Sequence, residues 1–568
     1  MSAGYGDNGL SEAREAFLAA AGLASHMTGH LARAVADGVT LSEAKLDERQ
    51  SDAYWLAVML SRLQAARSIL AFADRRGTAI ATAQARHFVA ETIVEMNAEL
   101  AYRSIEWGLA RVDVENAIGT PEVSGFVHRT LSAAEVDRLG QLTLDEPGEF
   151  GLDKDRELIR QQFRRFAEQK VVPVAARVHR EDDIIPMSII KAVAELGCFG
   201  LSIPERYGGL QPDDRDDNLG MCVVTEELSR GSLGVAGSLI TRPEILSKAL
   251  LKGGTEAQRE EWLPRLASGE TLCAVAVTEP DFGSDVAGLK VVATPVEGGW
   301  VLNGQKTWCT FAGMADVLMV LARSDADPKK GHRGLTIFLL EKPRFTGHEF
   351  SFEQKRVVDG RELVGKVTAR AIDTIGYRGM HSFDVFLEDV FVPDDNVLGG
   401  LGGIGKGFYY QMEGFTGGRL QTAARATGVM QAALDAALRY TKERKVFGKP
   451  VASYQLSRAK LARMGTITQV ARQCTYDCAA MVDAGKGQME SSMVKLWASR
   501  QAEWVTREAM QLHGGMGYAE EYDVSRYWVD ARVFSIFEGA EEVLALKVVA
   551  RQVLQRWLEE RGALVQVA

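Results

Sequence analysis

Glu538 stands in the segment Ile536-Phe537-Glu538-Gly539-Ala540, where a carboxylate lies between an aromatic residue and a glycine. A carboxylate in such a setting can remove a proton from a buried carbon acid, because apolar neighbours exclude water and strengthen the base. The alternative is a solvated glutamate in the first turn of a helix, which favours the helix dipole. The segment alone does not decide between these two interpretations.

Two further segments bring hydroxyl and aromatic side chains together. They are VTEPDFGSD, which begins at Val277, and NGQKTWCT, which ends at Thr310. Gly283 and Ser284 predict a tight turn whose backbone and hydroxyl can approach a ligand closely. Thr278, Thr310 and Trp308 could contact a ligand. They could equally be structural, since threonine favours strands and a buried aromatic residue anchors them.

The composition is that of a globular protein, with 46% hydrophobic and 25% charged residues in a chain of 568. That length suffices for three or four domains of about 150 residues. The net charge of −10 argues against a nucleic-acid surface but allows a local basic pocket for a phosphorylated ligand. No apolar stretch reaches the roughly 18 to 20 residues of a membrane span, and the start at Met1–Asp7 lacks signal-peptide features. We expect a cytoplasmic protein without a membrane span.

Cysteine and histidine form no metal-binding motif. The six cysteines and nine histidines include no CxxC pair and no HExxH, so we expect no metal site. Cys474 and Cys478 share an apolar stripe with Ile467 at helical spacing, which predicts reduced thiols in a helical core.

Hydrophobic periodicity divides the chain into four regions. Leu56, Leu63 and Leu70 recur with a helical period in the first, and the acidic stretch around Pro147-Gly148 predicts a linker. The second and fourth regions are also helical. We predict an extra N-terminal helical domain with a linker at 1–148, a helical domain at 149–270, a β domain at 271–400 and a helical bundle at 401–568.

The β domain is predicted from runs of β-branched and aromatic residues, two of which flank a Gly298-Gly299 turn. These runs are Val291–Thr294, Trp300–Asn303, Val317–Leu321 and Leu335–Leu340. No βαβ alternation is present and no GxGxxG follows a strand, which argues against a Rossmann dinucleotide site. A flavin or nucleotide must therefore be held in another way.

Five segments together resemble the acyl-CoA dehydrogenase family. They are VTEPDFGSD from Val277, NGQKTWCT from Asn303, RKVFGKP from Arg444, QLHGGMG from Gln511 and IFEGAEE from Ile536. They occur in the family's order, and the resemblance covers residues from about 150 to 555. It implies an α+β, mainly α fold with a helical domain, a β-barrel-like middle domain and a C-terminal four-helix bundle, here behind an extra N-terminal helical domain.

The resemblance implies an FAD enzyme that desaturates an acyl-CoA thioester. The reaction needs a base for the α proton, an acceptor for the β hydride and polarisation of the carbonyl. In the family, the glutamate that matches Glu538 is the base, and the flavin accepts the hydride. The backbone N–H of that glutamate and a flavin hydroxyl polarise the carbonyl. Phe537 suits a dry substrate site.

Two groups of residues match cofactor positions of the family. The hydroxyls of Thr278 and Thr310 are expected to bond the flavin ring, with Trp308 packed against it. Gly283 and Ser284 are expected close to the cofactor, Ser284 also reaching the substrate.

The second group matches positions that reach the adenosine and pyrophosphate of FAD across a dimer interface: Arg444, Phe447, Gln455, Gln511 and Gly515. The resemblance therefore implies a homo-oligomer. Taken alone, Arg444 is typical of a solvated helix charge. Electron-transfer flavoprotein is the electron acceptor that the resemblance implies.

Some family members carry the base immediately before an arginine in the first helix of the C-terminal bundle. Here that position is Gly418, which cannot act as a base, so the role stays with Glu538. Arg419 matches a family residue near CoA. Three departures put pocket shape and cofactor affinity in question: Phe282 replaces a small residue, Phe311 an asparagine and Ala540 a threonine that helps to bind FAD.

The N-terminal extension resembles one branch of the family, the enzymes that oxidise (2S)-methylsuccinyl-CoA to mesaconyl-CoA in the ethylmalonyl-CoA pathway. We therefore expect a short branched acyl group with a free carboxylate, which needs a cation in an otherwise apolar pocket. Arg242, in LITRP, is the candidate, although an arginine before proline can also be structural. Arg378 and His381 follow, from a loop that can equally cap the β domain.

The run from Tyr54 to Ala73 faintly echoes the run from Tyr454 to Ala480. Either the extension is a degenerate copy of the bundle helices, or two alanine-rich amphipathic helices look alike. A copy would cover the surface that docks a second dimer in tetrameric relatives. We accordingly predict a homodimer.

Rival functions differ in testable features. An enzyme for another short or branched acyl-CoA would need no carboxylate partner. An acyl-CoA oxidase would pass electrons to oxygen, which Trp308 and Thr310 at the flavin edge would help to exclude. A nucleic-acid-binding alkylation-response flavoprotein of the same fold should carry a concentrated basic surface, against the acidic balance. A non-catalytic scaffold gives no reason for Glu538 beside a full set of flavin residues.

Overall fold

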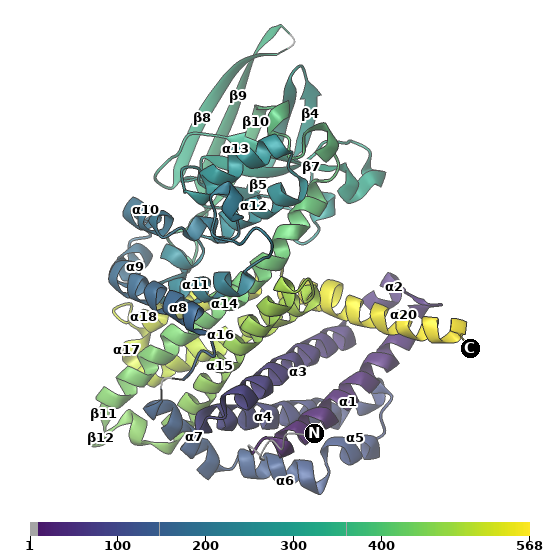
Figure 1. Ribbon diagram of the computed structural model, residues 1–568, viewed down its shortest axis with the longest axis vertical. Coiled ribbons are helices and arrows are strands. Elements are labelled where there is room, and N and C mark those ends of the chain that lie inside the picture. The colour runs from purple at the N-terminus through teal and green to yellow at the C-terminus, as the bar shows by residue number, and fades with distance from the viewer. Residues whose placement is uncertain (1–8, 147, 359, 568) are drawn as a thin grey trace. The chain divides into compact units, whose positions relative to one another are not determined.

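The computed structural model describes residues 9–146, 148–358 and 360–567. Pro147, in the predicted linker, lies outside the described residues. The chain forms two compact units (Figure 1): unit 1 comprises Met1–Leu158 and Thr422–Ala568, and unit 2 comprises Ile159–Gln421. Each unit is built around its own core.

The extension contributes a set of helices to unit 1. They are α1 (Ser11–Ala34), α2 (Glu43–Asp47), α3 (Gln50–Arg76), α4 (Ala79–Arg103), α5 (Arg111–Ile118), α6 (Pro121–Thr130) and α7 (Ala133–Asp145). A short hairpin of β1 (Ala36–Asp37) and β2 (Thr40–Leu41) interrupts the run of helices that the sequence predicts. Gly38, at φ 65°, permits this turn.

The C-terminal part of the chain supplies the rest of unit 1. Its elements are α14 (Gly407–Glu443), whose first half lies in unit 2, β11 (Lys445–Val446), β12 (Lys449–Pro450), α15 (Gln455–Asp483), α16 (Gln488–His513), α17 (Gly515–Tyr518), α18 (Asp523–Arg532), η11 (Val533–Ser535), α19 (Glu541–Val543), η12 (Leu544–Ala550) and α20 (Arg551–Val567). The extension packs directly on this bundle, because α3 contacts α15 and α16, and α7 contacts α15 (Figure 1).

Helix α3 is long and apolar enough by composition to cross a membrane. In the structure, however, 72% of its apolar window is buried. It packs against α4, α15 and α16. Its apolar character is thus accounted for by its place in the core of unit 1.

Unit 2 begins with helices. They are α8 (Lys154–Phe166), which starts in unit 1, α9 (Val172–Arg180), α10 (Met187–Glu195), α11 (Asn218–Gly231), α12 (Thr241–Gly253) and α13 (Glu256–Ala267). A single sheet follows, made of β3 (Cys273–Ala276), β4 (Val292–Val296), β5 (Gly299–Thr310), β6 (Val317–Arg323), β7 (Leu335–Glu341), β8 (Glu349–Val358), β9 (Arg361–Ala371) and β10 (Ser382–Pro393).

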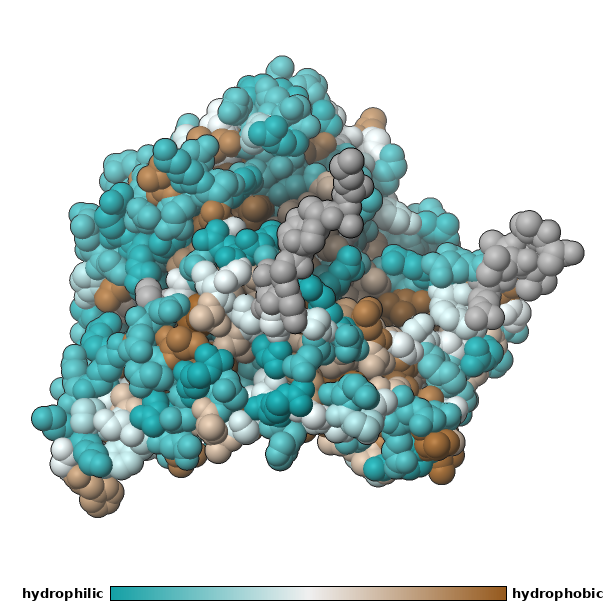
Figure 2. Space-filling view, turned by 60° about the horizontal axis from the view of Figure 1, so that its bottom comes forward, coloured by the Kyte–Doolittle hydropathy of each residue, from teal (hydrophilic) through white to brown (hydrophobic). Residues whose placement is uncertain are grey.

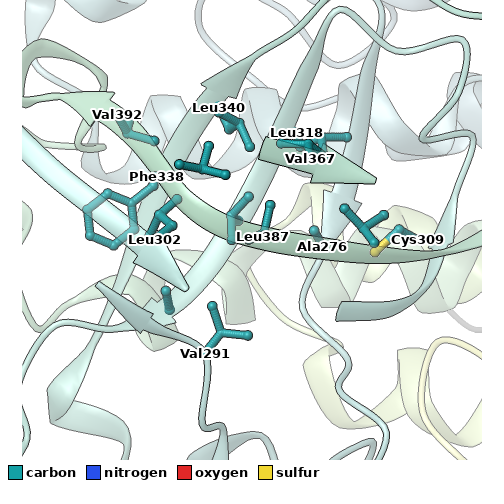
Figure 3. Close-up of a cluster of buried hydrophobic side chains, with 14 of the residues drawn as sticks. Ala276, Val291, Leu302, Cys309, Leu318, Phe338, Leu340, Val367, Leu387 and Val392 are labelled. Carbon is teal, nitrogen blue, oxygen red and sulfur yellow. The ribbon is translucent and has the colours of Figure 1, made fainter. Parts of the chain in front are cut away.

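The sheet has the order β3-β6-β4-β5-β10-β9-β8, with β7 paired to β6. Strand β6 is buried on both faces: Leu318 and Val320 point into the cluster of Figure 3, whereas Val317 and Met319 pack with α12 and α13. A strand covered on both faces reads as a continuous apolar run, which explains why this segment was predictable.

The surface is largely polar. On the face shown in Figure 2, hydrophobic residues form small separate groups within a mostly hydrophilic surface. All six cysteines are buried and free, and Cys474 and Cys478 lie in α15 as the sequence predicts.

Candidate active site

Glu538 lies in a loop of unit 1, between η11 and α19, and not in the first turn of a helix. The alternative of a solvated helical glutamate is therefore wrong. Its side chain is only 11% exposed. Its φ of 55° is rare for a residue with a side chain, and strained backbone of this kind persists only where the surroundings fix it.

Arg425 of α14 faces this carboxylate, and the sequence analysis missed it. Its Nη2 lies 3.9 Å from Glu538 Oε1, and its side chain is fully buried. The guanidinium also stacks over Phe537, 4.9 Å from the ring centre, and donates to Thr422 Oγ1 at 2.8 Å. A buried cation at this distance limits the orientations that the carboxylate can adopt.

Lys495 of α16 fixes the next residue of the loop. Its ammonium is buried and donates to the Gly539 carbonyl at 2.5 Å. Gly539 has φ 103°, and a Cβ there would come within 2.9 Å of Leu544 Cδ2. The Glu538 loop, residues 536–540, is thus held by buried cations from two helices.

In unit 2, the end of β5 presents Trp308 and Thr310. The pairing of β5 with β10 shifts by one residue between Cys309 and Lys306, which is a β-bulge. Trp308 sits in this bulge at φ 56° and is 53% exposed. The bulge re-aims one side chain of an otherwise regular strand, so the indole points out of the sheet while Cys309 points into the core (Figure 3).

Hydroxyl groups flank the exposed indole. Thr310 is buried and its Oγ1 lies 2.8 Å from Ser382 Oγ on β10. Thr278 is half-buried, and its carbonyl accepts from the Thr307 N–H at 2.9 Å. An exposed flat aromatic side chain with hydroxyls beside it suits a planar ring with polar edges, so these residues fit a flavin.

A buried ion pair holds the Thr278 loop against β5. Lys306 Nζ donates to Glu279 Oε1 at 2.8 Å and to the Val277 carbonyl at 2.9 Å. The Glu279 carboxylate also accepts the backbone N–H groups of Lys290 and Val291. Burial lowers the pKa of Lys306 and the facing carboxylate opposes that shift. Both residues lie inside the motif segments, yet the sequence analysis assigned them no role.

The turn at Gly283 and Ser284 is exposed, as a turn that approaches a ligand requires. Phe282, which replaces a small residue of the family, stays within unit 2: Lys290 lies over its ring at 5.0 Å. Phe311, another departure, is buried at φ 72°, and its N–H donates to the His381 carbonyl at 2.8 Å.

The residues predicted to reach FAD across a dimer interface are all exposed on unit 1: Arg444, Phe447, Gln455, Gln511 and Gly515. Phe447 is 96% exposed at φ 49°, in the hairpin of β11 and β12. Other large apolar side chains are exposed in the same segments, including Leu456 and Tyr518. Exposed apolar residues that gather in this way mark an interaction surface.

Arg242 occupies the first turn of α12 and is only 7% exposed. Its Nη1 and the neighbouring Thr241 Oγ1 are buried without a hydrogen-bond partner among the described residues. The guanidinium forms no ion pair within the same part of the chain. A buried charge without a partner is costly, so this position calls for an anion.

The other cationic candidates already have partners. Arg378 donates to the carbonyls of Thr374 and His179, and its Nε lies 3.4 Å from Asp182 Oδ1. His381 Nε2 lies 3.2 Å from the same oxygen. With His348 these groups form the one His/Cys/Asp/Glu cluster of metal-binding geometry within the described residues. Because a guanidinium contacts the carboxylate, we assign no metal to it.

Gly418 and Arg419 lie in the part of α14 that belongs to unit 2, Gly418 buried and Arg419 half-buried. A Cβ at the preceding Gly417 would meet the carboxylate of Glu244 at 2.3 Å. That carboxylate is buried and accepts from Gln421 Nε2. Gly417 therefore makes room for Glu244, which explains why no side chain occupies that position.

Comparison with known proteins gives three family matches. The acyl-CoA dehydrogenase N-terminal domain matches residues 153–270, the middle domain 274–390 and the C-terminal domain 405–554. A (2S)-methylsuccinyl-CoA dehydrogenase from Cereibacter sphaeroides is 39% identical over 92% of this chain and 94% of its own. That coverage is too large to leave out the extension.

Solved structures agree with these matches. Butyryl-CoA dehydrogenase from Megasphaera elsdenii is 33% identical, with a TM-score of 0.63 over 72% of this chain and 100% of its own. A glutaryl-CoA dehydrogenase from Mycobacterium smegmatis in complex with FADH2 is 25% identical, with a TM-score of 0.60 over 74% and 97%. The chain, an oxidoreductase that acts on acyl-CoA with FAD, therefore belongs to the acyl-CoA dehydrogenase family.

Proposed function

We propose that the protein oxidises (2S)-methylsuccinyl-CoA to mesaconyl-CoA, with Glu538 as the base for the α proton. The observation that carries the substrate class is Arg242, a buried guanidinium with an orphaned N–H. A dicarboxylic acyl group would supply the anion that this position lacks. The relative from Cereibacter sphaeroides, which shares the extension, supports the same choice.

The chain's own residues would divide the work as follows. Glu538, oriented by Arg425, takes the α proton, and its backbone N–H polarises the thioester carbonyl. Phe537 and the buried stem of Arg425 keep water from the carboxylate. Ser284 and Arg419 are proposed to bind the CoA side of the substrate.

FAD, when bound, accepts the hydride from the β carbon. Thr278, Thr310 and Trp308 are the proposed contacts of its ring, and Gly283 lets the backbone approach it. Arg444, Phe447, Gln455, Gln511 and Gly515 are proposed to hold its adenosine and pyrophosphate from a second copy of the chain. Their shared exposure supports an intersubunit role.

A homodimer follows from the same proposal. The extension covers α15 and α16 within its own chain, so those helix faces are not open to a second dimer. A tetramer with those faces paired, measured by light scattering and cross-linking, would refute the homodimer. Electron-transfer flavoprotein is the proposed acceptor in a cytoplasmic enzyme, and peroxide formation in air would point instead to an oxidase.

The test is anaerobic bleaching of the flavin absorbance near about 450 nm, a property of the flavin itself. (2S)-Methylsuccinyl-CoA, butyryl-CoA and glutaryl-CoA are compared, with Glu538→Gln as the base control. We expect rapid bleaching by methylsuccinyl-CoA alone. Loss of the base should slow it by about 10²- to 10⁴-fold. Rapid bleaching by butyryl-CoA would remove the argument for a carboxylate partner.

Arg242→Met tests the substrate class separately. We expect kcat/KM for methylsuccinyl-CoA to fall about 100-fold, because loss of one partner of a buried charge pair costs about 2–5 kcal/mol. Any residual activity with butyryl-CoA should be unchanged. Arg215→Met, which removes an exposed arginine of unit 2, is the matched control. Equal losses for both substrates would show that Arg242 is structural.

A further inference from the structure

The N-terminal extension forms ion pairs and a hydrogen bond with the segment that follows the Glu538 loop, η12 and α20. Lys547 Nζ of η12 lies 3.3 Å from Glu43 and 3.1 Å from Asp47, both on α2. Arg551 Nε of α20 lies 2.8 Å from the same Glu43 carboxylate. Farther along α20, the side chain of Gln555 accepts from the Leu41 N–H at 3.0 Å. The segment that follows the loop is thus tied to the extension at successive points.

The contact nearest the loop is made by Tyr54 of α3. Its hydroxyl donates to Glu541 Oε1, and Glu541 is the first residue of α19, directly after the loop. Arg500 of α16 donates to the Tyr54 oxygen at 2.6 Å and to Glu541 Oε1 at 3.1 Å. The three side chains close a triangle that joins the extension, the bundle and the end of the loop.

Two sides of this triangle are partly shielded from water, whereas the Arg500 side chain is 39% exposed. Tyr54 is half-buried, and the Glu541 side chain is 18% exposed. Burial and the hydrogen bond to the Glu541 carboxylate raise the pKa of Tyr54 to about 12. The hydroxyl therefore remains a donor over the whole working range of pH.

A strained loop needs such anchors. Glu538 at φ 55° is a conformation that a residue with a side chain abandons unless its surroundings fix it. Arg425 and Lys495 fix the loop from within the bundle. Tyr54 and Arg500 fix its far end, where the loop passes into α19.

We propose that Tyr54 is a positioning residue for Glu538, so that the N-terminal extension forms part of the catalytic apparatus. The inference rests on the proposed role of Glu538 as base. Tyr54 acts through Glu541: it holds the start of α19 and thereby the backbone angle from which the Glu538 carboxylate projects. Small displacements of a catalytic group lower the rate without weakening substrate binding.

The test is Tyr54→Phe in the full-length, FAD-loaded enzyme. We expect the rate of flavin bleaching by (2S)-methylsuccinyl-CoA to fall about 10-fold with KM changed less than about twofold, since only the reacting geometry is disturbed. FAD content and melting temperature should stay close to wild type. Deuterium at the substrate α carbon should slow the variant more than the wild type, because proton removal becomes more limiting.

Tyr102→Phe is the matched control. Tyr102 also lies in the extension and donates to a glutamate, Glu99, at 2.7 Å, but it is 73% exposed and remote in sequence from the loop contacts. The Tyr102→Phe variant should keep the wild-type rate of flavin bleaching. Glu541→Ala supplies a double-mutant cycle: if Tyr54 acts through the Glu541 side chain, the Tyr54→Phe effect should largely vanish in the Glu541→Ala background.

The outcomes separate the two proposals. Full activity of Tyr54→Phe with an inactive Glu538→Gln refutes the positioning role alone. A loss that accompanies FAD release or a lower melting temperature shows a merely structural role and also refutes it. Normal bleaching by Glu538→Gln refutes the base assignment, and the Tyr54 inference falls with it.

Discussion

The Glu538 loop of unit 1 and the Trp308 bulge of unit 2 share one feature and differ in another. Both hold a non-glycine residue at positive φ, 55° and 56°. The Glu538 carboxylate is nearly buried and faced by the buried guanidinium of Arg425, whereas the indole is 53% exposed and its bulge is fixed by backbone pairing.

The difference between the two regions depends on whether the reacting group belongs to the protein or to a cofactor. The proposed base must be oriented by the protein itself, so a buried guanidinium faces it before any ligand binds. A residue that contacts a cofactor needs only a rigid backbone and an open face, because the cofactor completes the site. In unit 2 the buried charges do not face the exposed indole. They form the Glu279–Lys306 ion pair, which holds the Thr278 loop.

The largest expected effect is on that pair. Glu279→Ala or Lys306→Met should each lower the free energy of unfolding by about 3–5 kcal/mol, because removal of one partner leaves a buried charge unpaired. The double variant Glu279→Met/Lys306→Met should cost less than the sum. Urea denaturation of the FAD-loaded enzyme, together with its FAD content, measures both the stability and the support of the Thr278 loop.

An exposed pair in the same segment is the control. Lys290 and Asp281 lie 3.8 Å apart with side chains 71% and 77% exposed, so Asp281→Ala should cost less than about 1 kcal/mol. Equal costs for the two pairs would contradict the view that buried charge fixes the flavin edge.

The next largest expected effect is a fall in kcat when Arg425 is replaced. Arg425→Met should lower kcat about 100-fold, or about 2.7 kcal/mol, since the carboxylate loses the cation that orients it. Arg425→Lys should recover part of the loss, because an ammonium keeps the charge without the planar stacking on Phe537.

Arg439→Met, at an exposed position of the same helix, controls for a general loss of positive charge on α14. If Arg425→Met leaves kcat unchanged, the buried cation is not needed to orient the proposed base. The contrast between the two regions would then rest on backbone strain alone.

The sequence revealed the residues with local signals and missed those with distant partners. Strand β6 was predictable because its apolar run is continuous, whereas the role of Glu538 was inferred from its segment together with four others in the family's order and stays a prediction. Arg425 and Tyr54 gave no signal, since each looks like an ordinary residue of an alanine-rich helix and acquires its role from a segment far along the chain. Sheet order and the bulge at Trp308 depend on pairing between distant strands, which no single run of residues encodes.

A smaller effect is expected at Gly539. Gly539→Ala adds a Cβ at φ 103° that would lie 2.9 Å from Leu544 Cδ2. Strain at such a position costs about 1–3 kcal/mol, and the displaced loop should lower the bleaching rate with little change in KM. Gly298→Ala has φ 74° in an open turn of unit 2 with no close neighbour, so it should reduce stability without affecting the rate.

A pH-dependent effect on stability separates paired from unpaired buried lysines in unit 2. Lys342 Nζ donates only to the carbonyls of Gly313 and Pro343 and lies over the rings of Phe345 and Phe350. It forms no ion pair among the described residues, and burial lowers its pKa to about 7. Lys306, by contrast, faces a carboxylate.

The sign of the pH dependence follows from proton binding. Between about pH 7 and the ordinary lysine pKa near 10.4, the unfolded chain keeps a proton that the folded Lys342 has lost, so stability rises with pH there. Its slope should be at most about 1.4 kcal/mol per pH unit. Lys342→Met removes this contribution, whereas the exposed Lys329→Met should not. The unfolding free energy of Lys342→Met minus that of the wild type should therefore fall steadily from pH 7 to 10, because only the wild type gains stability through Lys342. A constant difference would mean that Lys342 is charged in the fold throughout that range.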